Sequence, residues 1–217
     1  PGLASVLANG SLLSFIMLMR GDLILHASAV DVGNRAVAFV GHAGKGKSTM
    51  ATLMCAAGAR IITDDVLRVD LSGPIARCHL GTVETRLRKA AVELAEQFAS
   101  SPAVRHTSDE RHAISVGSGA VDLLPLAAII VPQPRRDLNE VVVERVSGVG
   151  ALLTLSSFPR LVGWEETSVQ ARHFEQLAEL LDGVPLYLGN VPWGPPFARD
   201  IAPRLLEGIG LPALAAS

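Results

Sequence analysis

The chain has 217 residues, of which 49% are hydrophobic and 18% are charged, and its formal net charge is −2. This composition excludes an intrinsically disordered chain, and the small negative charge argues against a general binder of nucleic acid or of membrane surfaces. Cys55 and Cys78 are too few for a disulfide framework, so we expect a reduced, cytosolic protein. The length predicts one domain over residues 1–217, without internal repeats or a linker.

An apolar run covers residues 12–19. This run is shorter than the about 20 residues that a membrane-spanning helix requires, and Arg20 and Asp22 close it. We therefore interpret it as a buried strand, the first of a β-meander whose later strands alternate with glycine-containing turns. The strands expected here cover residues 14–19, 23–32 and 35–40.

A glycine-rich loop follows the third of these strands. Residues 41–48 read Gly-His-Ala-Gly-Lys-Gly-Lys-Ser, which fits the pattern of a phosphate-binding loop. Its glycines allow the backbone N–H groups to turn inward, while Lys47 reaches the outer phosphates of a nucleotide and Ser48 ligates Mg²⁺. A helix is expected over residues 50–57, with Gly58 as its C-cap. The residues expected to bind the nucleotide are Gly41, His42, Ala43, Gly44, Lys45, Gly46, Lys47, Ser48 and Thr49.

Two adjacent carboxylates end the next predicted strand, over residues 60–63. In open α/β sheets, ligands bind beyond the carboxyl ends of strands, where Asp64 and Asp65 would lie. A carboxylate there can hold a metal ion or accept a proton from an attacking hydroxyl. The alternative is a pair of turn-forming aspartates. His26, within the apolar strand over residues 23–32, taken alone reads as a hydrogen-bonded core residue.

The rest of the chain alternates between extended and helical patterns, which predicts an α/β protein with a mixed sheet flanked by helices. Residues 100–109 are interpreted as a polar loop, residues 132–137 as a break, and residues 192–196 as a rigid loop. Trp193 in that last loop either lines a substrate groove or packs against the C-terminal segment. Strands are expected over residues 66–71, 74–80, 112–116, 126–131, 140–146 and 184–188. Helices are expected over residues 86–98, 150–155, 168–181 and 198–207.

The segment from His26 to Val69 resembles the kinase core of the HPr kinase/phosphorylase family of bacterial serine kinases. The matching motifs are the His-x-x-x-Val strand, the Gly-x-x-Gly-x-Gly-Lys-Ser loop and the Asp-Asp step that ends the next strand. The resemblance implies a P-loop kinase core of the HPr kinase/PEP carboxykinase type. By the resemblance, Asp65 is the general base and His26 lies near the phosphates. Asp64 is a supporting neighbour and candidate metal ligand.

The resemblance weakens after the aspartate pair. Glu84-Thr85-Arg86 is similar to a Glu-x-Arg segment whose glutamate is a metal ligand in the family, so Glu84 is a candidate ligand. The alternative is an exposed charge at a helix start. The glycine-rich continuation of the family segment is missing, a departure that bears on the reverse, phosphorylase reaction. Spacing does not choose among the candidates for a phosphate-binding arginine, which are Arg86, Arg88, Arg135, Arg136 and Arg145.

These observations predict an ATP- and Mg²⁺-dependent kinase that phosphorylates a serine of a protein or peptide. The resemblance is to compact HPr kinase-like proteins, some of which modify ribosomally made peptide precursors, including those of lasso peptides. The expected partner is therefore an HPr-like protein or a precursor peptide, without nucleic acid or membrane, and the family hints at a homo-oligomer. The alternatives are a kinase of small-molecule hydroxyls and a non-catalytic nucleotide-binding regulatory module.

Overall fold

A computed structural model of the chain describes residues 12–79, 123–160 and 166–214, together with the backbone of residues 84–87, 103–106 and 112–115. The account below concerns these residues.

The described residues contain a nine-stranded mixed sheet. Its long strand β10 (Leu123–Arg135) runs parallel to β3 (Ala36–Val40) on one side and to β12 (Leu186–Pro192) on the other. Strand β2 (Ala27–Asp31) lies antiparallel between β3 and β4 (Arg60–Thr63). The carboxyl ends of β3, β4, β10 and β12 therefore meet at one edge, where β2 begins. The other strands of this sheet are β1 (Leu23–Leu25), β5 (Leu67–Asp70), β6 (Arg77–His79) and β11 (Val142–Val146).

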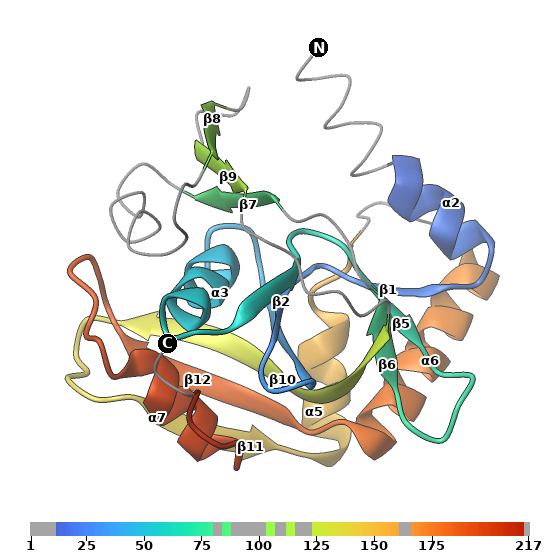
Figure 1. The fold of residues 1–217 in the computed structure, drawn as a ribbon. Helices are drawn as coiled ribbons and strands as arrows, with labels where there is room; N and C mark the ends of the chain where they lie inside the picture. The colour runs from blue at the N-terminus through green and yellow to red at the C-terminus, as the bar shows by residue number, and fades with distance from the viewer. Residues whose placement is uncertain are drawn as a thin grey trace.

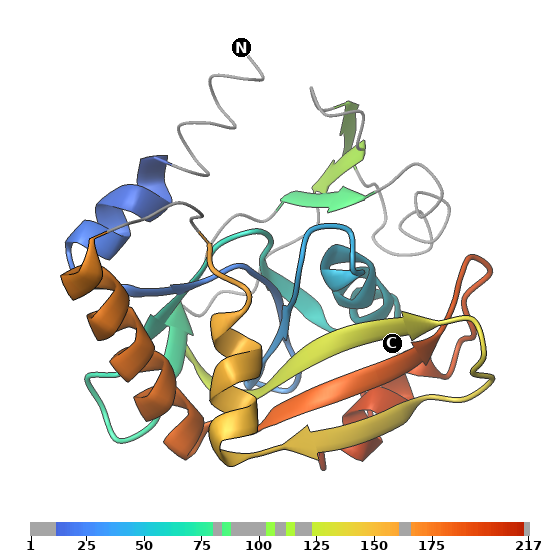
Figure 2. The same ribbon diagram turned by 180° about the vertical axis from the view of Figure 1, so that it is seen from behind.

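Helices cover both faces of this sheet, as Figures 1 and 2 show from opposite sides. Helices α3 (Lys47–Ala56) and α7 (Ile201–Gly208) pack on one face. Helices α5 (Gly148–Ser156) and α6 (Thr167–Gly183) pack on the other. The short helix α2 (Leu13–Met19) precedes β1. The arrangement is a mixed sheet flanked by helices, as the sequence predicted.

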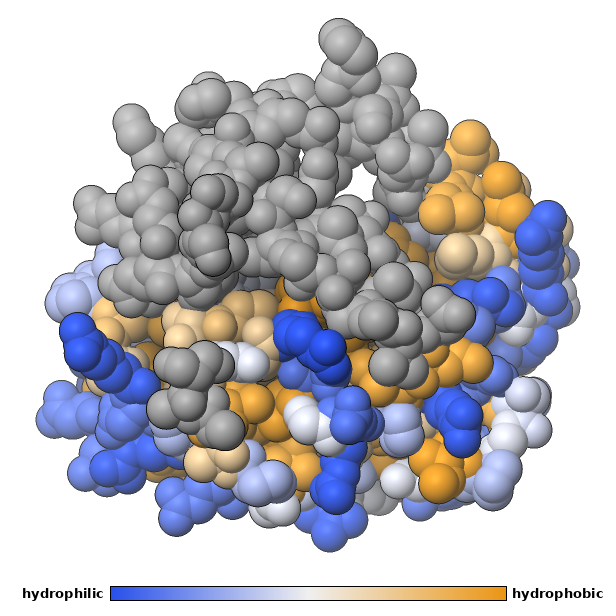
Figure 3. Space-filling model, in the orientation of Figure 1, coloured by the Kyte–Doolittle hydropathy of each residue, from blue (hydrophilic) through white to orange (hydrophobic). Residues whose placement is uncertain are grey.

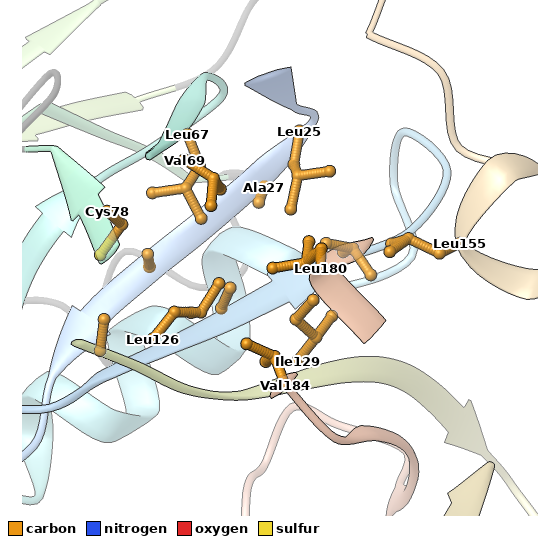
Figure 4. Packing of buried hydrophobic residues seen from close by; sticks show 14 of the residues in the cluster. Leu25, Ala27, Leu67, Val69, Cys78, Leu126, Ile129, Leu155, Leu180 and Val184 are labelled. Carbon is orange, nitrogen blue, oxygen red and sulfur yellow. The ribbon is translucent and has the colours of Figure 1, made fainter. Parts of the chain in front are cut away.

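The alternation of side chains along β3 explains why the sheet holds two helical layers. Ala36, Ala38 and Val40 belong to the core cluster that contains residues of α5 and α6, whereas Val37 and Phe39 pack with α3 and α7. Successive side chains of a strand point to opposite faces, so a strand that is apolar throughout is buried on both. Figure 4 shows part of the first cluster, in which Leu155 and Leu180 come from the two helices, and Leu126 and Ile129 come from β10.

The predicted first strand is wrong, because residues 13–19 form helix α2. Only Ser14 and Leu18 of α2 are buried, whereas Phe15 is 44% and Met19 is 55% exposed. Figure 3 shows apolar surface over this helix. Leucine and methionine favour helices when no neighbouring strand pairs with them. The β-meander is accordingly reduced to the β2–β3 hairpin, and β1 pairs with β5 instead. No helix among the described residues is long and apolar enough to cross a bilayer.

Two predictions in the middle of the chain also fail where the structure describes it. The expected helix over residues 86–98 begins in strand β7 (Glu84–Leu87), and its remaining residues lie outside the described part. The expected loop over residues 100–109 contains β8 (Ala103–His106). Both strands pair with β9 (His112–Ser115) in a separate three-stranded sheet. Pairing with a strand distant in sequence overrides the local helical pattern.

Residues 132–137 were expected to break the chain, but β10 continues through Pro132 and Pro134 to Arg135. Beyond Ile130 the strand pairs only with β12, because β3 has already ended. The N–H of Ile129 and the carbonyl of Arg135 form hydrogen bonds on the β12 side of β10. Successive residues of a strand direct these groups to alternate sides, so the backbone nitrogens of Pro132 and Pro134 face the side from which β3 is missing. Proline is tolerated there because no ladder hydrogen bond is required of its nitrogen.

The single strand expected over residues 23–32 is divided into β1 and β2, and His26 lies in the bend between them instead of within a strand. The remaining predicted elements are confirmed within one to four residues at most ends. Strand β4 has the predicted bounds, and α3 begins three residues earlier than expected, directly at Lys47. Strand β12 is displaced toward the C-terminus relative to residues 184–188 and ends at Pro192. As a result, α3 begins and β12 ends at the same edge of the sheet, beside the glycine loop.

The centre of the sheet leaves no room beside Gly189 of β12. A Cβ atom there would lie 2.9 Å from Ile130 Cγ2 and 3.2 Å from Leu205 Cδ2. We expect Gly189→Ala to lower the free energy of unfolding by about 1–3 kcal/mol through overpacking, as measured by urea denaturation. Gly183→Ala is the matched control, because nothing lies within 4 Å of its added Cβ. Equal stability of the two variants would contradict the close packing of α7 on this strand.

Candidate functional site

The glycine loop joins β3 to α3 at the carboxyl edge of the sheet. Gly44 and Gly46 have φ values of 79° and 95°, in the region that side chains disfavour. A Cβ on Gly46 would meet nothing within 4 Å, so the backbone conformation itself, and not crowding, requires glycine there. Lys47 and Ser48 then open the helix, whose N-terminal N–H groups and dipole favour an anion.

Lys47 is almost fully buried, with 7% of its surface exposed. Its Nζ donates hydrogen bonds to the carbonyl oxygens of Gly41 at 2.8 Å and of His42 at 3.3 Å. The ammonium group is therefore folded over the loop itself. A buried positive charge held by neutral carbonyls is well placed to exchange them for phosphate oxygens, since hydrogen bonds between ionised partners are stronger.

Asp64 connects the loop helix to two neighbouring strands. Its Oδ1 accepts hydrogen bonds from Ser48 Oγ at 2.9 Å and from Ser28 Oγ. Because Asp64 is 7% exposed, these hydroxyls hold its carboxylate in one place. The carboxylate of Asp64 and the hydroxyl of Ser48 thus stand together beside the start of α3.

Asp65 is held differently, between a histidine and an arginine. Arg160 Nη2 donates to Asp65 Oδ2 at 2.9 Å, and His26 Nδ1 lies 3.3 Å from Asp65 Oδ1 without the alignment of a hydrogen bond. The φ of Asp65 is 89°, a strained value for a residue other than glycine. Such strain is typical of functional positions, and here it aims the carboxylate, 31% exposed, toward the ring of His26.

These groups line one cavity of about 380 Å³, a volume typical of small-ligand sites. The polar residues that line the cavity are Lys47, Ser48, Asp64, Asp65 and His26. Its apolar residues include Pro134, Val191, Pro192, Trp193, Gly194, Pro195 and Phe197. These apolar residues belong to the ends of β10 and β12 and to the segment after β12, whereas Asp64 and Asp65 follow β4, at the other end of the strand order β4-β2-β3-β10-β12.

The sequence-predicted residues are therefore brought together, with exceptions. The cavity is lined by Ala43, Gly44, Gly46 and Thr49 of the predicted loop, whereas Gly41, His42 and Lys45 do not line it. His42 instead packs its ring edge-on against Phe158, with the ring centres 4.9 Å apart. Glu84 lies in β7, where the structure describes the backbone alone.

Three of the arginines suggested by the sequence are described with their side chains, and each has a position other than beside Asp65. Arg135 pairs with Asp137 at 2.6 Å, a hydrogen bond that lowers the pKa of Asp137. Arg136 lies over the Trp193 ring, 4.6 Å from its centre, and Arg145 is exposed on β11. Arg86 lies in β7 with its backbone alone described, and Arg88 lies outside the described residues.

Arg160 and Ser28 are the residues that sequence reasoning missed. Arg160 follows α5 and is separated from Asp65 by 95 positions, so no local pattern could connect the two. Ser28 had a usable signal, because it follows His26 by two residues in an extended segment and so shares its face. In the structure, His26 lies in the bend just before β2 and approaches Asp65, while Ser28 lies within β2 and donates to Asp64.

The two cysteines take no part in this site. Burial raises the pKa of the Cys55 and Cys78 thiols to about 12. They therefore stay protonated at neutral pH and act as packing residues.

The oxygen donors at the start of α3 fit Mg²⁺ that arrives with a phosphate ligand. Mg²⁺ is usually held by one or two protein oxygens together with phosphates and water, and Ser48 and Asp64 provide such a pair. Among the residues whose side chains are described, no three His, Cys, Asp or Glu residues gather as a metal site. A resident metal ion held by the protein alone does not fit this part of the chain.

No protein-family model matches the chain, and no curated protein matches it in sequence. Among solved structures, the chain is similar to the Hpr(Ser) kinase/phosphatase from Coxiella burnetii, with a TM-score of 0.41 and 10% sequence identity, over 86% of this chain and 93% of that chain. This level of similarity assigns no family to the chain.

Proposed function

We propose that the protein is an ATP-dependent kinase that transfers the γ-phosphoryl group to a hydroxyl, with a serine of a protein or peptide as the acceptor. The observation that carries the proposal is that Asp65 and Lys47 line the same cavity, at the carboxyl edge of the sheet where α3 begins. A phosphoryl group held by the lysine would face a base that is ready for the acceptor.

Each residue of the site has a role that follows from its position. The N–H groups of the glycine loop and of the start of α3 bind phosphate oxygens, and Lys47 balances their charge. Ser48 and Asp64 provide oxygen ligands for the metal ion. Mg²⁺ and ATP, when bound, supply the phosphoryl group and the charge that stabilises its leaving group.

Asp65 accepts the proton of the acceptor hydroxyl as its oxygen attacks phosphorus. Arg160 fixes one carboxylate oxygen through the 2.9 Å hydrogen bond. The other oxygen, Oδ1, lies on the side of His26, which lines the same cavity. Orienting a base in this way places its lone pair toward the reacting group, which is the main contribution of positioning residues to catalysis.

The choice of a serine acceptor follows from the family resemblance of the motif segment, and the site itself accommodates other hydroxyls. A small-molecule kinase would retain all the roles above. A regulatory nucleotide-binding module would not require the polar arrangement around Asp65.

Calorimetry with ATP in the presence and absence of Mg²⁺ tests the first step. We expect ATP to bind with a Kd in the micromolar to millimolar range and at least about tenfold more tightly with Mg²⁺ than with EDTA, because the ion joins the Ser48 and Asp64 oxygens to the phosphates. Absence of Mg²⁺-dependent binding would reject the kinase.

The acceptor class is tested with γ-³²P-ATP and two acceptor panels. One panel contains serine peptides with varied flanking residues, and the other contains sugars and hydroxylated metabolites. Labelled peptides support the proposal, labelled metabolites favour the small-molecule kinase, and nucleotide binding without any labelled product favours the regulatory module.

A further inference from the structure

We propose that the apolar side of the cavity binds the nucleotide base, which stacks on the indole of Trp193. We call this surface the Trp193 wall and define it by Pro134, Val191, Pro192, Trp193 and Phe197. The inference rests on the proposed kinase function and adds a base-binding surface to a site whose phosphate-binding part is the glycine loop.

The order of strands places this wall at the correct end of the nucleotide. Across the sheet the order is β4, β2, β3, β10, β12. Asp65 follows β4 and the glycine loop follows β3, whereas the wall comes from the ends of β10 and β12. The γ-phosphate must face Asp65 for transfer. Because the phosphates form a linear chain across the loop, the nucleoside extends away from Asp65, toward the wall.

Trp193 is presented to the cavity and held there. Its backbone N–H donates to the carbonyl of Arg135 at 2.8 Å, which anchors it to the end of β10. The Arg136 guanidinium lies 4.6 Å from the centre of the ring, as in cation–π pairs, yet the residue remains 51% exposed. A large aromatic residue that is half-exposed at a cavity and fixed in position is an effective stacking surface.

Phe197 belongs to the Trp193 wall because the chain turns tightly at Gly194. A Cβ on Gly194 would lie 2.4 Å from the Phe197 ring, so only glycine at this position lets the ring fold back against the chain. The turn therefore keeps Phe197 beside Trp193 at the cavity. The sequence between the two aromatic residues, Gly-Pro-Pro, leaves little freedom for either to move away.

The chemistry of the wall predicts how bases are distinguished. Its side chains carry no hydrogen-bonding group other than the indole N–H of Trp193. Such a surface recognises the face of a base and not the pattern of donors and acceptors on its edge, and stacking increases with ring area. We expect ATP and GTP to bind within about fivefold of each other, and both to bind more tightly than CTP and UTP.

The decisive experiment compares Mg·ATP with Mg·tripolyphosphate, which has the phosphates but no base. Calorimetry on the full chain would measure both Kd values for wild type, Trp193→Ala and Trp193→Phe. We expect Trp193→Ala to weaken ATP binding about tenfold or more and to leave tripolyphosphate binding within about twofold. Trp193→Phe should retain most of the ATP affinity. Phe174→Ala is the matched control, because Phe174 is 44% exposed on α6 and does not line the cavity.

The outcomes separate this inference from the proposed function. If wild type binds neither ligand, the phosphate site and the kinase are rejected. If wild type binds tripolyphosphate as tightly as ATP, or Trp193→Ala affects both ligands equally, the base-binding wall alone is rejected. An increase in acceptor KM with unchanged ATP affinity in Trp193→Ala would also reject it, in favour of acceptor docking. If Trp193→Ala fails to fold, the wild-type series decides, because UTP binding as tightly as ATP contradicts stacking.

Discussion

Asp65→Asn is expected to lower the rate of phosphoryl transfer by about 10²- to 10⁴-fold, the usual contribution of a general base. The amide cannot accept the hydroxyl proton, although it keeps the shape of the side chain. Asparagine is the suitable replacement because it tolerates the positive φ of 89° at this position better than alanine does. The measurement is single-turnover transfer from γ-³²P-ATP to the best acceptor of the panels, beside the Kd of Mg·ATP, which should change by less than about threefold.

The control for Asp65→Asn is Asp182→Asn, at an exposed position near the end of α6. Thermal unfolding must accompany both, because Asp65→Asn leaves the Arg160 guanidinium, which is 11% exposed, without its charged partner. Transfer at the wild-type rate by a folded Asp65→Asn protein would remove Asp65 as the base. It would leave the phosphate-binding role of the loop unaffected.

Lys47→Met is expected to reduce kcat/KM for ATP by about 10²- to 10³-fold, the effect of removing one buried donor to a developing charge. Methionine fills a similar volume, so the buried stem of the side chain remains packed while the charge is lost. Binding and rate should both decline, because in the proposed mechanism Lys47 contacts phosphate oxygens in the ground state and stabilises them further during transfer. Initial rates at varied ATP concentration provide kcat and KM separately.

Lys45→Met provides the comparison within the same loop. The Lys45 side chain is exposed and does not line the cavity, whereas Lys47 is buried against the loop carbonyls. We expect the effect of Lys45→Met on kcat/KM to be at least ten times smaller, since position 45 contributes to the loop through its backbone. Equal losses in the two variants would mean that the loop responds to total charge and that the placement of Lys47 is not specific.

The sequence predicted well those parts of the fold in which local pattern and tertiary context agree. The apolar segments that became β2, β3 and β4 are buried on both faces, so their hydrophobic runs identify them directly. The wrong predictions concern segments whose structure depends on contacts with residues distant in the sequence. Residues 13–19 are apolar but lie largely exposed in α2, and Arg86 and Leu87 have a helical pattern but pair with β9. Pro132 predicted a break, but it lies where β10 has no partner on one side.

The candidate site divides in the same way. The aspartate pair was predicted near the loop because the carboxyl ends of neighbouring strands meet at one edge, and Asp64 does lie 2.9 Å from Ser48. Arg160 was not predicted, because the candidate arginines were chosen by their resemblance to the family. Arg160 lies after the C-terminal end of α5 and reaches Asp65 only in the folded chain. The assigned roles of His26, Lys47 and Asp65 remain predictions for the experiments above.

The sequence by itself determined the chemistry available to this protein, since a glycine loop with a lysine and a serine, followed by two aspartates, dictates backbone and charge locally. Only the tertiary structure decided which groups complete that chemistry. Ser28 lies in β2, Arg160 follows α5 and Trp193 follows β12, so their positions at Asp64, at Asp65 and at the cavity depend on strand order and helix packing. The physical reason is that the proposed phosphate binding by the loop requires only a short continuous segment, whereas the proposed orientation of Asp65 and stacking on Trp193 require contacts between residues far apart along the chain.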